Sequence, residues 1–326
     1  MKTNRSEIRK QIFDSYSKNL ELICDRFKIQ FGIKSEKGFE KVNEKIYVCP
    51  LCFKVFYELD LDQNRQNPLT IEDLPPKSIR KSILILTCKK CNNEAGYKFD
   101  YLIKQHVKTD PFLKGIANSM ISANLNLNDK KYIKGQFKIL EDKSLLFELP
   151  DSLTSFLNDS FENLIKNWSQ KPFTLQFTVP QIRQVELAYL RIGYLIFFSY
   201  FGYLAVLDNN LKMLREQLLQ PSEEKLKNLG IIYNLEKKNA PEGVHIIKQP
   251  VNIKTYLVVI DVSDKSLKKK IGILIPGPGE KGLNCYRNFI SLKNSENLEL
   301  VNLSSKDFLI NRDFINAYYY FYENIN

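Results

Sequence analysis

The chain has 326 residues, enough for two domains or for one domain with a small metal module attached. Hydrophobic residues make up 44% of it and charged residues 26%, which is the balance of a globular protein and excludes a disordered chain. The net charge of +11 suits a polyanionic partner such as nucleic acid, although a merely lysine-rich composition gives the same charge.

The N-terminal 45 residues are predicted to form a helix and a linker. Apolar residues recur at three- and four-residue steps between positions 6 and 29, which predicts a helix there. A polar, lysine-rich connection then runs to residue 45. The charged opening of the chain does not have the pattern of a secretory signal, so we expect a cytoplasmic protein with reduced thiols.

Four of the six cysteines fall into two C-x-x-C pairs, Cys49 with Cys52 and Cys88 with Cys91. Each pair can point two thiolates at one tetrahedral ion, so the spacing predicts a closed four-cysteine structural zinc site. A disulfide framework is the alternative, and reduced thiols disfavour it. The other two cysteines, at positions 24 and 285, stand alone in apolar surroundings and are expected to be buried and unreactive.

Short strand patterns flank both cysteine pairs. Residues 46–48 and 53–57 read as a hairpin around the first pair, and residues 83–87 form an apolar, β-rich run that leads into the second. Residues 69–71 are predicted to form another strand, with Glu72 and Asp73 at its end. The following Pro75 and Pro76 are expected to terminate that strand. A helix is predicted after Cys91. Residues 46–120 are therefore treated as one zinc module.

Two segments of this module, TIEDLPPKS at 70–78 and CKKCNNEAG at 88–96, resemble those of HNH endonucleases. The resemblance implies a small, zinc-stabilised ββα-metal module, treble-clef-like, that hydrolyses DNA with Mg²⁺ or Mn²⁺. It implies that Glu72, Asn92 and Asn93 bind the catalytic metal and that Asp73 occupies the position of the usual histidine base. Gly96 and Asp100 match the pattern C-N-N-x-x-G-x-x-x-D that some members share.

Aspartate at position 73 departs from the family pattern, because a carboxylate is a weaker base than imidazole near neutral pH. Asp73 could instead be a metal ligand beside a metal-bound hydroxide, or His106 could supply the base. A third possibility is an inactive nuclease that only binds nucleic acid. A zinc-containing protein–protein adaptor is a fourth, and it needs no metal other than zinc.

Basic residues around the module are the candidates for contacts with nucleic acid, most simply double-stranded DNA. They are Lys77, Arg80, Lys81, Lys89, Lys90 and Lys98. Resembling bacterial proteins suggest a role in restriction or antiphage defence. A protein partner or a second copy of the chain remains open.

Residues 121–326 are predicted to form a larger α+β domain for recognition or regulation, so the predicted fold class is α+β. Alternating segments at 132–139 and 144–149 predict a hairpin, followed by a helix at 151–168 and a strand at 173–177. A long central helix is expected from Pro180 to Leu219, and four strands near 244–247, 255–262, 270–275 and 298–303. Residues 188–207 are apolar enough to raise the question of a membrane span. Arg191 and four tyrosines inside them favour a buried core helix.

Overall fold

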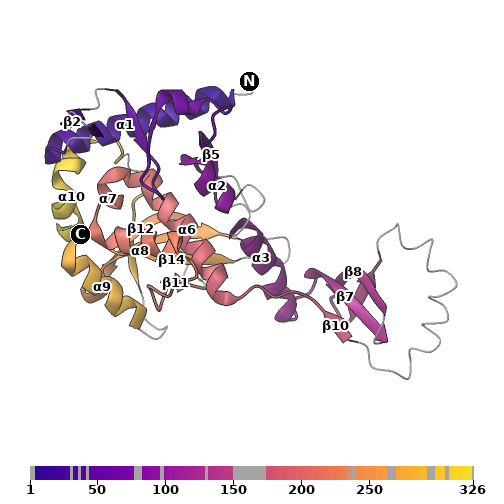
Figure 1. Cartoon of the computed structure of the whole chain (residues 1–326). Helices are drawn as coiled ribbons and strands as arrows, with labels where there is room; N and C mark the ends of the chain where they lie inside the picture. The colour runs from indigo at the N-terminus through magenta and orange to yellow at the C-terminus, as the bar shows by residue number, and fades with distance from the viewer. Residues whose placement is uncertain are drawn as a thin grey trace. The chain divides into compact units, whose positions relative to one another are not determined.

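The computed structural model describes residues 4–29, 32–35, 38–41, 44–76, 83–95, 99–128, 131–149, 174–233, 235, 240–262, 269–291, 298–304 and 308–324. Helices and strands are mixed along the chain, which confirms the α+β class (Figure 1). The chain divides into two compact units: residues 1–101, 186–262 and 269–326 form the first, and residues 102–185 and 263–268 form the second. The cysteine pairs therefore share a unit with the C-terminal strands.

The first unit begins with helix α1, Arg5–Phe27, close to the predicted bounds. The side chain of Asn4 caps it by accepting a hydrogen bond from the backbone N–H of Ser6. Three antiparallel strand pairs follow. They are β1 (Gly32–Ser35) with β2 (Gly38–Lys41), β3 (Ile46–Val48) with β4 (Val55–Tyr57), and β5 (Leu69–Leu74) with β6 (Ile83–Cys88). The short helix α2, Lys89–Ala95, starts inside the second cysteine pair rather than after it.

A five-stranded antiparallel sheet forms the core of the first unit, with strand order β11-β14-β13-β12-β15. Its strands are β11 (Ile231–Ile232), β12 (Gly243–Gln249), β13 (Tyr256–Asp261), β14 (Lys270–Ile275) and β15 (Glu299–Asn302), so the four predicted C-terminal strands are confirmed. The three central strands each bury at least four consecutive residues, as expected for strands covered on both faces.

Helices cover the two faces of this sheet through alternate residues of β13. Tyr256 packs against Phe197 of α6 (Ile182–Phe201) and Tyr322 of α10 (Arg312–Asn324) with tilted rings, whose centroids lie 4.8 and 5.4 Å away. The next residue, Leu257, faces the other way and packs in a cluster with Tyr286 of α9 (Gly279–Ser291). Figure 1 shows α6 crossing the sheet. The C-terminal helix α10 thus covers part of the core.

The long helix predicted from Pro180 to Leu219 is wrong in one respect, because it is three helices: α6, α7 (Tyr203–Val206) and α8 (Asn209–Leu219). The first break falls at Gly202, whose φ of +60° lies in the left-handed region that favours glycine. A side chain there would also collide with the side chain of Asn19 in α1. The second break falls at Asp208, whose side chain caps α8.

The second unit contains α3 (Tyr101–Leu113) and a four-stranded antiparallel sheet of order β10-β7-β8-β9. Its strands are β7 (Met120–Asn128), β8 (Lys131–Ile139), β9 (Leu145–Glu148) and β10 (Thr174–Gln176). The predicted hairpin is confirmed as β8 and β9, with Phe137 opposite Phe147. A small core forms around Phe112 and Leu125. The helix predicted at 151–168 lies outside the described residues.

No helix in the described part of the chain combines the length and apolar character that crossing a membrane requires. The apolar stretch from Ala188 to Leu207 is instead core: Leu190, Tyr194 and Phe198 are fully buried against the rest of the first unit.

Candidate functional site

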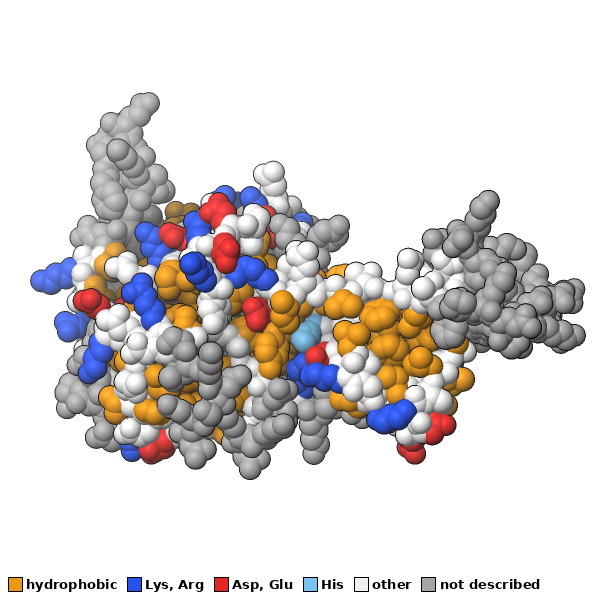
Figure 2. All heavy atoms as spheres, turned by 90° about the horizontal axis from the view of Figure 1, so that it is seen from below, with side chains coloured by type: hydrophobic (Ala, Val, Ile, Leu, Met, Phe, Trp, Pro, Cys, Tyr) orange, Lys and Arg blue, Asp and Glu red, His pale blue; other side chains and the backbone are white. Residues whose placement is uncertain are grey.

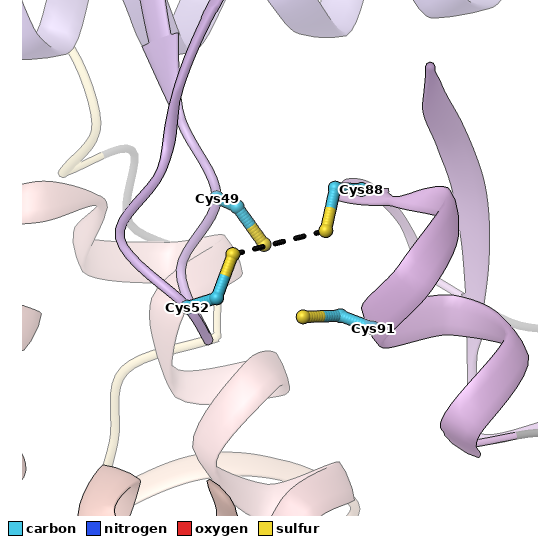
Figure 3. Close-up of side chains that lie close together, drawn as sticks. All are labelled: Cys49, Cys52, Cys88 and Cys91. Atoms are coloured by element: carbon cyan, nitrogen blue, oxygen red, sulfur yellow. Dashed lines mark hydrogen bonds between the residues drawn. The ribbon is translucent and has the colours of Figure 1, made fainter. Parts of the chain in front are cut away.

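Four cysteine side chains converge at one point in the first unit (Figure 3). Cys49 and Cys52 come from the turn between β3 and β4, and Cys88 and Cys91 come from the end of β6 and the first turn of α2. All four Sγ atoms lie within 4.8 Å of one another, and Cys52 Sγ lies 3.7 Å from Cys88 Sγ. Zn–S bonds of about 2.3 Å in a tetrahedron place two sulfurs roughly 3.8 Å apart. The cluster therefore has the donors and spacing that could hold a metal ion such as zinc.

Local backbone geometry shapes the first pair. The N–H of Phe53 donates to the carbonyl of Cys49, and the N–H of Cys49 donates to the carbonyl of Lys54. Phe53 adopts φ +58°, which turns the chain back sharply after the second cysteine. These bonds bring the two thiols of the pair to one side of a tight turn.

The second pair is positioned by the strand–helix junction. The N–H of Lys89 donates to the carbonyl of Pro68, and the N–H of Lys90 donates to the side chain of Asn67. The first N–H groups of α2 are therefore satisfied by the segment that leads into β5. Tyr47 adds a link between the two halves of the module, because its buried hydroxyl donates to the carbonyl of Leu86 at 2.6 Å.

The thiols influence one another because they are so close. A hydrogen bond from Cys49 is the main reason that the pKa of Cys52 is lowered to about 7, and hydrogen bonds from Cys49, Cys52 and Cys91 lower the pKa of Cys88. Thiolates are the form that binds metal. Burial raises the pKa of Cys49, and hydrogen bonds with the other three thiols raise that of Cys91. Burial also raises the pKa of the two isolated cysteines, Cys24, which is half-buried, and Cys285, which is buried.

Three side chains of the α6–α8 segment contact the turn that carries the first cysteine pair. The hydroxyl of Tyr203 donates to the carbonyl of Val48 at 2.7 Å and accepts from the N–H of the same residue at 2.8 Å. The hydroxyl of Tyr194 donates to the carbonyl of Pro50 at 2.8 Å. The guanidinium of Arg215 lies 3.6 Å from the ring centre of Phe53, a cation–π contact.

Glu72, the predicted acidic ligand, is engaged by an arginine. It is 5% exposed, and its Oε1 lies 2.7 Å from Nη1 of Arg191 in α6, which is 3% exposed. Its other oxygen, Oε2, accepts a hydrogen bond of 3.1 Å from the hydroxyl of Thr87. Both oxygens of this buried carboxylate thus have partners, which is what burial of a charge requires.

Asn92 lies beside the strand that carries Glu72. Its amide nitrogen donates to the hydroxyl of Thr70 at 2.9 Å and to the carbonyl of Ile71 at 3.1 Å. Both bonds use the nitrogen, so they orient the carboxamide with its oxygen at the opposite end. Asn93, the next residue, is exposed.

Two further carboxylates lie near this strand. The pKa of Asp100 is raised to about 6, first by burial and then by the charges of Glu72 and Asp73, against a lowering effect of Arg191. Asp73 is partly exposed, and because consecutive strand residues point to opposite faces, it faces away from the side where Glu72 meets Arg191. Its predicted role as base or ligand stays a prediction.

The remaining predicted residues are distributed as follows. His106 is buried on α3 in the second unit. Lys89 and Lys90 are exposed at the start of α2. Lys77, Arg80, Lys81, Gly96 and Lys98 lie outside the described residues. Figure 2 shows lysine and arginine side chains scattered over the visible face, with acidic side chains among them.

Arg191 and Thr87 are the site residues that sequence reasoning missed. Arg191 was noticed only as a charge within an apolar helix. That pattern is itself a signal, because a charged residue in a buried helix requires a buried counter-charge. The signal does not identify the partner, which lies 119 positions away in the sequence.

Among the described residues, the four cysteines are the one group of three or more cysteine, histidine, aspartate or glutamate side chains close enough to share an ion. Comparison with family models, with curated proteins and with solved structures gave no match. The site must therefore be interpreted from its own chemistry.

Proposed function

We propose that this chain is an HNH-type, metal-dependent endonuclease that hydrolyses phosphodiester bonds in DNA, with one structural zinc ion held by Cys49, Cys52, Cys88 and Cys91. The observation that carries the proposal is the convergence of two motif segments at the cysteine cluster. Asn92, at the start of the helix, is hydrogen-bonded to the strand that carries Glu72. The resembling nucleases use residues at these two positions for the catalytic metal.

The donor chemistry suits the metal that the family uses. Mg²⁺ and Mn²⁺ take carboxylate and carbonyl oxygens, with water and substrate phosphate filling the remaining positions. Glu72 offers such oxygens, whereas Asn92 faces the strand that carries Glu72 with its amide nitrogen and not with its oxygen. A bound divalent ion would stabilise the charge on the leaving oxygen of the phosphodiester. Because Oε1 of Glu72 is engaged by Arg191, loading the site requires that ion pair to open.

A carboxyl group must replace the usual histidine as the proton acceptor. Asp73 occupies the family position, and a carboxylate is a weaker base than imidazole near neutral pH. Asp100 has a pKa of about 6, which is closer to neutral pH and therefore better matched to proton transfer. His106 remains a further prediction for this role.

Cleavage of supercoiled plasmid by the zinc-loaded protein in Mg²⁺, Mn²⁺ or EDTA tests the proposal. We expect nicking in Mn²⁺ or Mg²⁺, none in EDTA, and loss of cleavage in Glu72→Ala because that change removes a metal ligand. Asp73→His should retain or increase cleavage, because imidazole is the better base near pH 7. The exposed carboxylate of Asp142 provides a matched control, Asp142→Ala, which should cleave normally. Cleavage that survives Glu72→Ala undiminished would contradict the assignment.

Binding of nucleic acid without cleavage is the second candidate function. It is favoured by the aspartate at position 73 and by the buried ion pair of Glu72. In this case both wild type and Glu72→Ala should bind duplex DNA, with a log–log salt slope of about −0.9 per phosphate contact. Replacing the exposed Lys89 and Lys90 together should flatten that slope. Binding that does not change between low and physiological salt would favour a protein–protein adaptor. A role in restriction or antiphage defence rests on the resemblance alone.

A further inference from the structure

One face of the four-stranded sheet in the second unit is turned to solvent. Successive residues of a strand point to opposite faces, and Ile121, Leu125 and Phe137 pack into the small core on one of them. The residues between them therefore face away from that core. The exposed polar residues of this outer face, which we call the amide face, are Ser122, Asn124, Lys134, Gln136, Thr174 and Gln176.

The strand register places these side chains in rows. Gln176 of β10, Asn124 of β7 and Lys134 of β8 lie opposite one another in one row. Ser122 and Gln136 lie opposite each other in the next row. Neighbouring strands are about 4.8 Å apart, so the three strands of the first row span roughly 10 Å. The major groove of B-DNA is about 12 Å wide and admits β-strands, so the first row fits within its width.

The amide side chains on this face are not explained by the fold. Asparagine is depleted in β-strands, yet β7 carries Asn124 and Asn126 at successive positions of the outer face. No hydrogen bond among the described residues uses the amides of Asn124, Gln136 or Gln176. A carboxamide presents a donor and an acceptor side by side, which matches the N7 acceptor and N6 donor of adenine in the major groove.

The charge of this face favours a polyanion over a protein partner. Lys134 is exposed in the first row, and Lys138 lies further along the same strand. Among the described residues of the outer face, Glu148 on the edge strand β9 is the one carboxylate. The described apolar side chains on this face, Met120 and Leu146, are both in the row of Lys138. A protein interface is usually centred on apolar and aromatic side chains, which the first row does not contain.

We propose that the amide face reads base edges in the major groove of double-stranded DNA and gives the chain a preference for adenine-containing sites. Asn124 and Gln176 each donate to N7 of an adenine and accept from its N6 amino group, and Lys134 contacts a backbone phosphate. This inference rests on the proposed nuclease function for its substrate, and it adds sequence preference to that function.

Selection from a pool of randomised duplex DNA tests the inference. The full-length, zinc-loaded protein is used without Mg²⁺ or Mn²⁺, so that bound DNA is not cut. We expect an adenine-containing site that binds about tenfold or more tightly than random duplex at the same salt concentration. Asn124→Ala combined with Gln176→Ala should lose this preference and keep its affinity for random duplex to within about threefold, because the lysines remain. Glu141→Ala, at an exposed carboxylate in the β8–β9 turn, is the matched control and should select the wild-type site.

A change of specificity separates base reading from a structural role. Arginine pairs with O6 and N7 of guanine, so Asn124→Arg should shift the selected base from adenine to guanine at one position of the site. A structural role of Asn124 would leave the selected base unchanged. If the double alanine variant does not melt cooperatively, Gln176→Ala alone replaces it. That variant changes only the edge strand β10 and should lose the preference at a single base.

The outcomes distinguish this inference from the proposed function. Wild-type protein that binds duplex DNA without enriching any sequence, or a double alanine variant that selects the wild-type site, would overturn the inference and leave the nuclease proposal intact. Enrichment from single-stranded RNA and none from duplex DNA would overturn the choice of partner. Selective DNA binding without cleavage in Mn²⁺ would contradict the nuclease proposal alone, and absence of any DNA binding at low salt would overturn both.

Discussion

At the residue scale, the site is governed by how buried carboxylates are neutralised. Glu72 is stabilised by a guanidinium and a hydroxyl, whereas Asp100 is half-buried near two other carboxylates and has its pKa raised to about 6. The two acids thus differ in their surroundings although they lie in the same region: Glu72 has a cationic partner, whereas burial raises the pKa of Asp100. Such a difference is what allows one carboxyl to bind a cation while another exchanges a proton.

The raised pKa of Asp100 predicts a pH-dependent stability effect. The folded pKa of about 6 exceeds the ordinary aspartate value of 3.8, so the folded protein binds more protons than the unfolded chain between these pH values. Ionised Asp100 therefore destabilises the fold above about pH 6. We therefore expect Asp100→Asn to increase the free energy of unfolding at about pH 7.5, with the gain disappearing near pH 4. Urea denaturation at the two pH values measures this.

The control variant, at Asp142, is expected to change the free energy of unfolding in the opposite direction. Hydrogen bonds from the hydroxyl and N–H of Ser144 lower the pKa of the exposed Asp142, so its ionised form stabilises the fold above the unfolded pKa and the stabilisation is lost as pH falls through the folded pKa. Asp142→Asn should thus lower stability at neutral pH and not in acid. A gain of stability from Asp142→Asn, or none from Asp100→Asn at neutral pH, would contradict these pKa directions.

At the element scale, the sequence predicts the two cysteine pairs but not the helices α6–α8 that contact the first pair. The spacing C-x-x-C fixes both pairs of ligands locally, and the strands β3, β6 and β12 follow from short apolar runs. The breaks in the helical segment were missed because the apolar pattern continues across Gly202. A lone glycine within a helical pattern signals a break only when its neighbours in space are known, here the side chain of Asn19.

Two tyrosines of the α6–α8 segment allow a quantitative test of its hydrogen bonds to the first cysteine pair. Tyr203 makes two hydrogen bonds to the backbone of Val48, whereas Tyr194 makes one to Pro50, and both side chains are fully buried. Tyr203→Phe should lower the free energy of unfolding by about 1–3 kcal/mol, because it leaves buried backbone groups unsatisfied. Tyr194→Phe should cost less. Equal costs in urea denaturation would show that the second hydrogen bond of Tyr203 contributes nothing.

Gly202 offers a second test at this scale. Gly202→Ala adds a methyl group that would collide with Oδ1 of Asn19, and it does so at φ +60°. Gly115 has a similar φ of +66° but no atom within 4 Å of the added carbon, so Gly115→Ala measures backbone strain alone. We expect Gly202→Ala to lower the melting temperature more than Gly115→Ala does. Equal shifts of the melting temperature in the two variants would show that α1 and α7 can move apart to accommodate the added methyl group.

At the scale of the whole molecule, the four-cysteine cluster is part of a larger unit. A self-contained module at residues 46–120 would unfold alone when its metal is lost. The contacts of Tyr203, Tyr194 and Arg215 with the first cysteine pair instead join the cluster to the helices that cover the central sheet. These contacts join segments more than 140 residues apart, which is why no local pattern revealed them.

Loss of the metal should therefore affect the first unit as a whole. Structural zinc contributes on the order of 10 kcal/mol to folding small metal-dependent modules. Cys88→Ser should consequently destabilise the central sheet as well as the β5–β6 pair, which hydrogen exchange on residues of β13 and β14 measures. Cys285→Ser, at a buried cysteine outside the cluster, is the matched control. Protection of β13 that survives Cys88→Ser unchanged would mean that the module unfolds independently.

Zinc K-edge X-ray absorption on protein purified under reducing conditions tests the central claim most directly, because the proposed site is built on the four-cysteine centre. The account predicts one zinc per chain with four sulfur neighbours at about 2.3 Å, and loss of that signal in Cys88→Ser. Protein that contains no zinc, or zinc bound by nitrogen or oxygen in place of the four sulfurs, would contradict it.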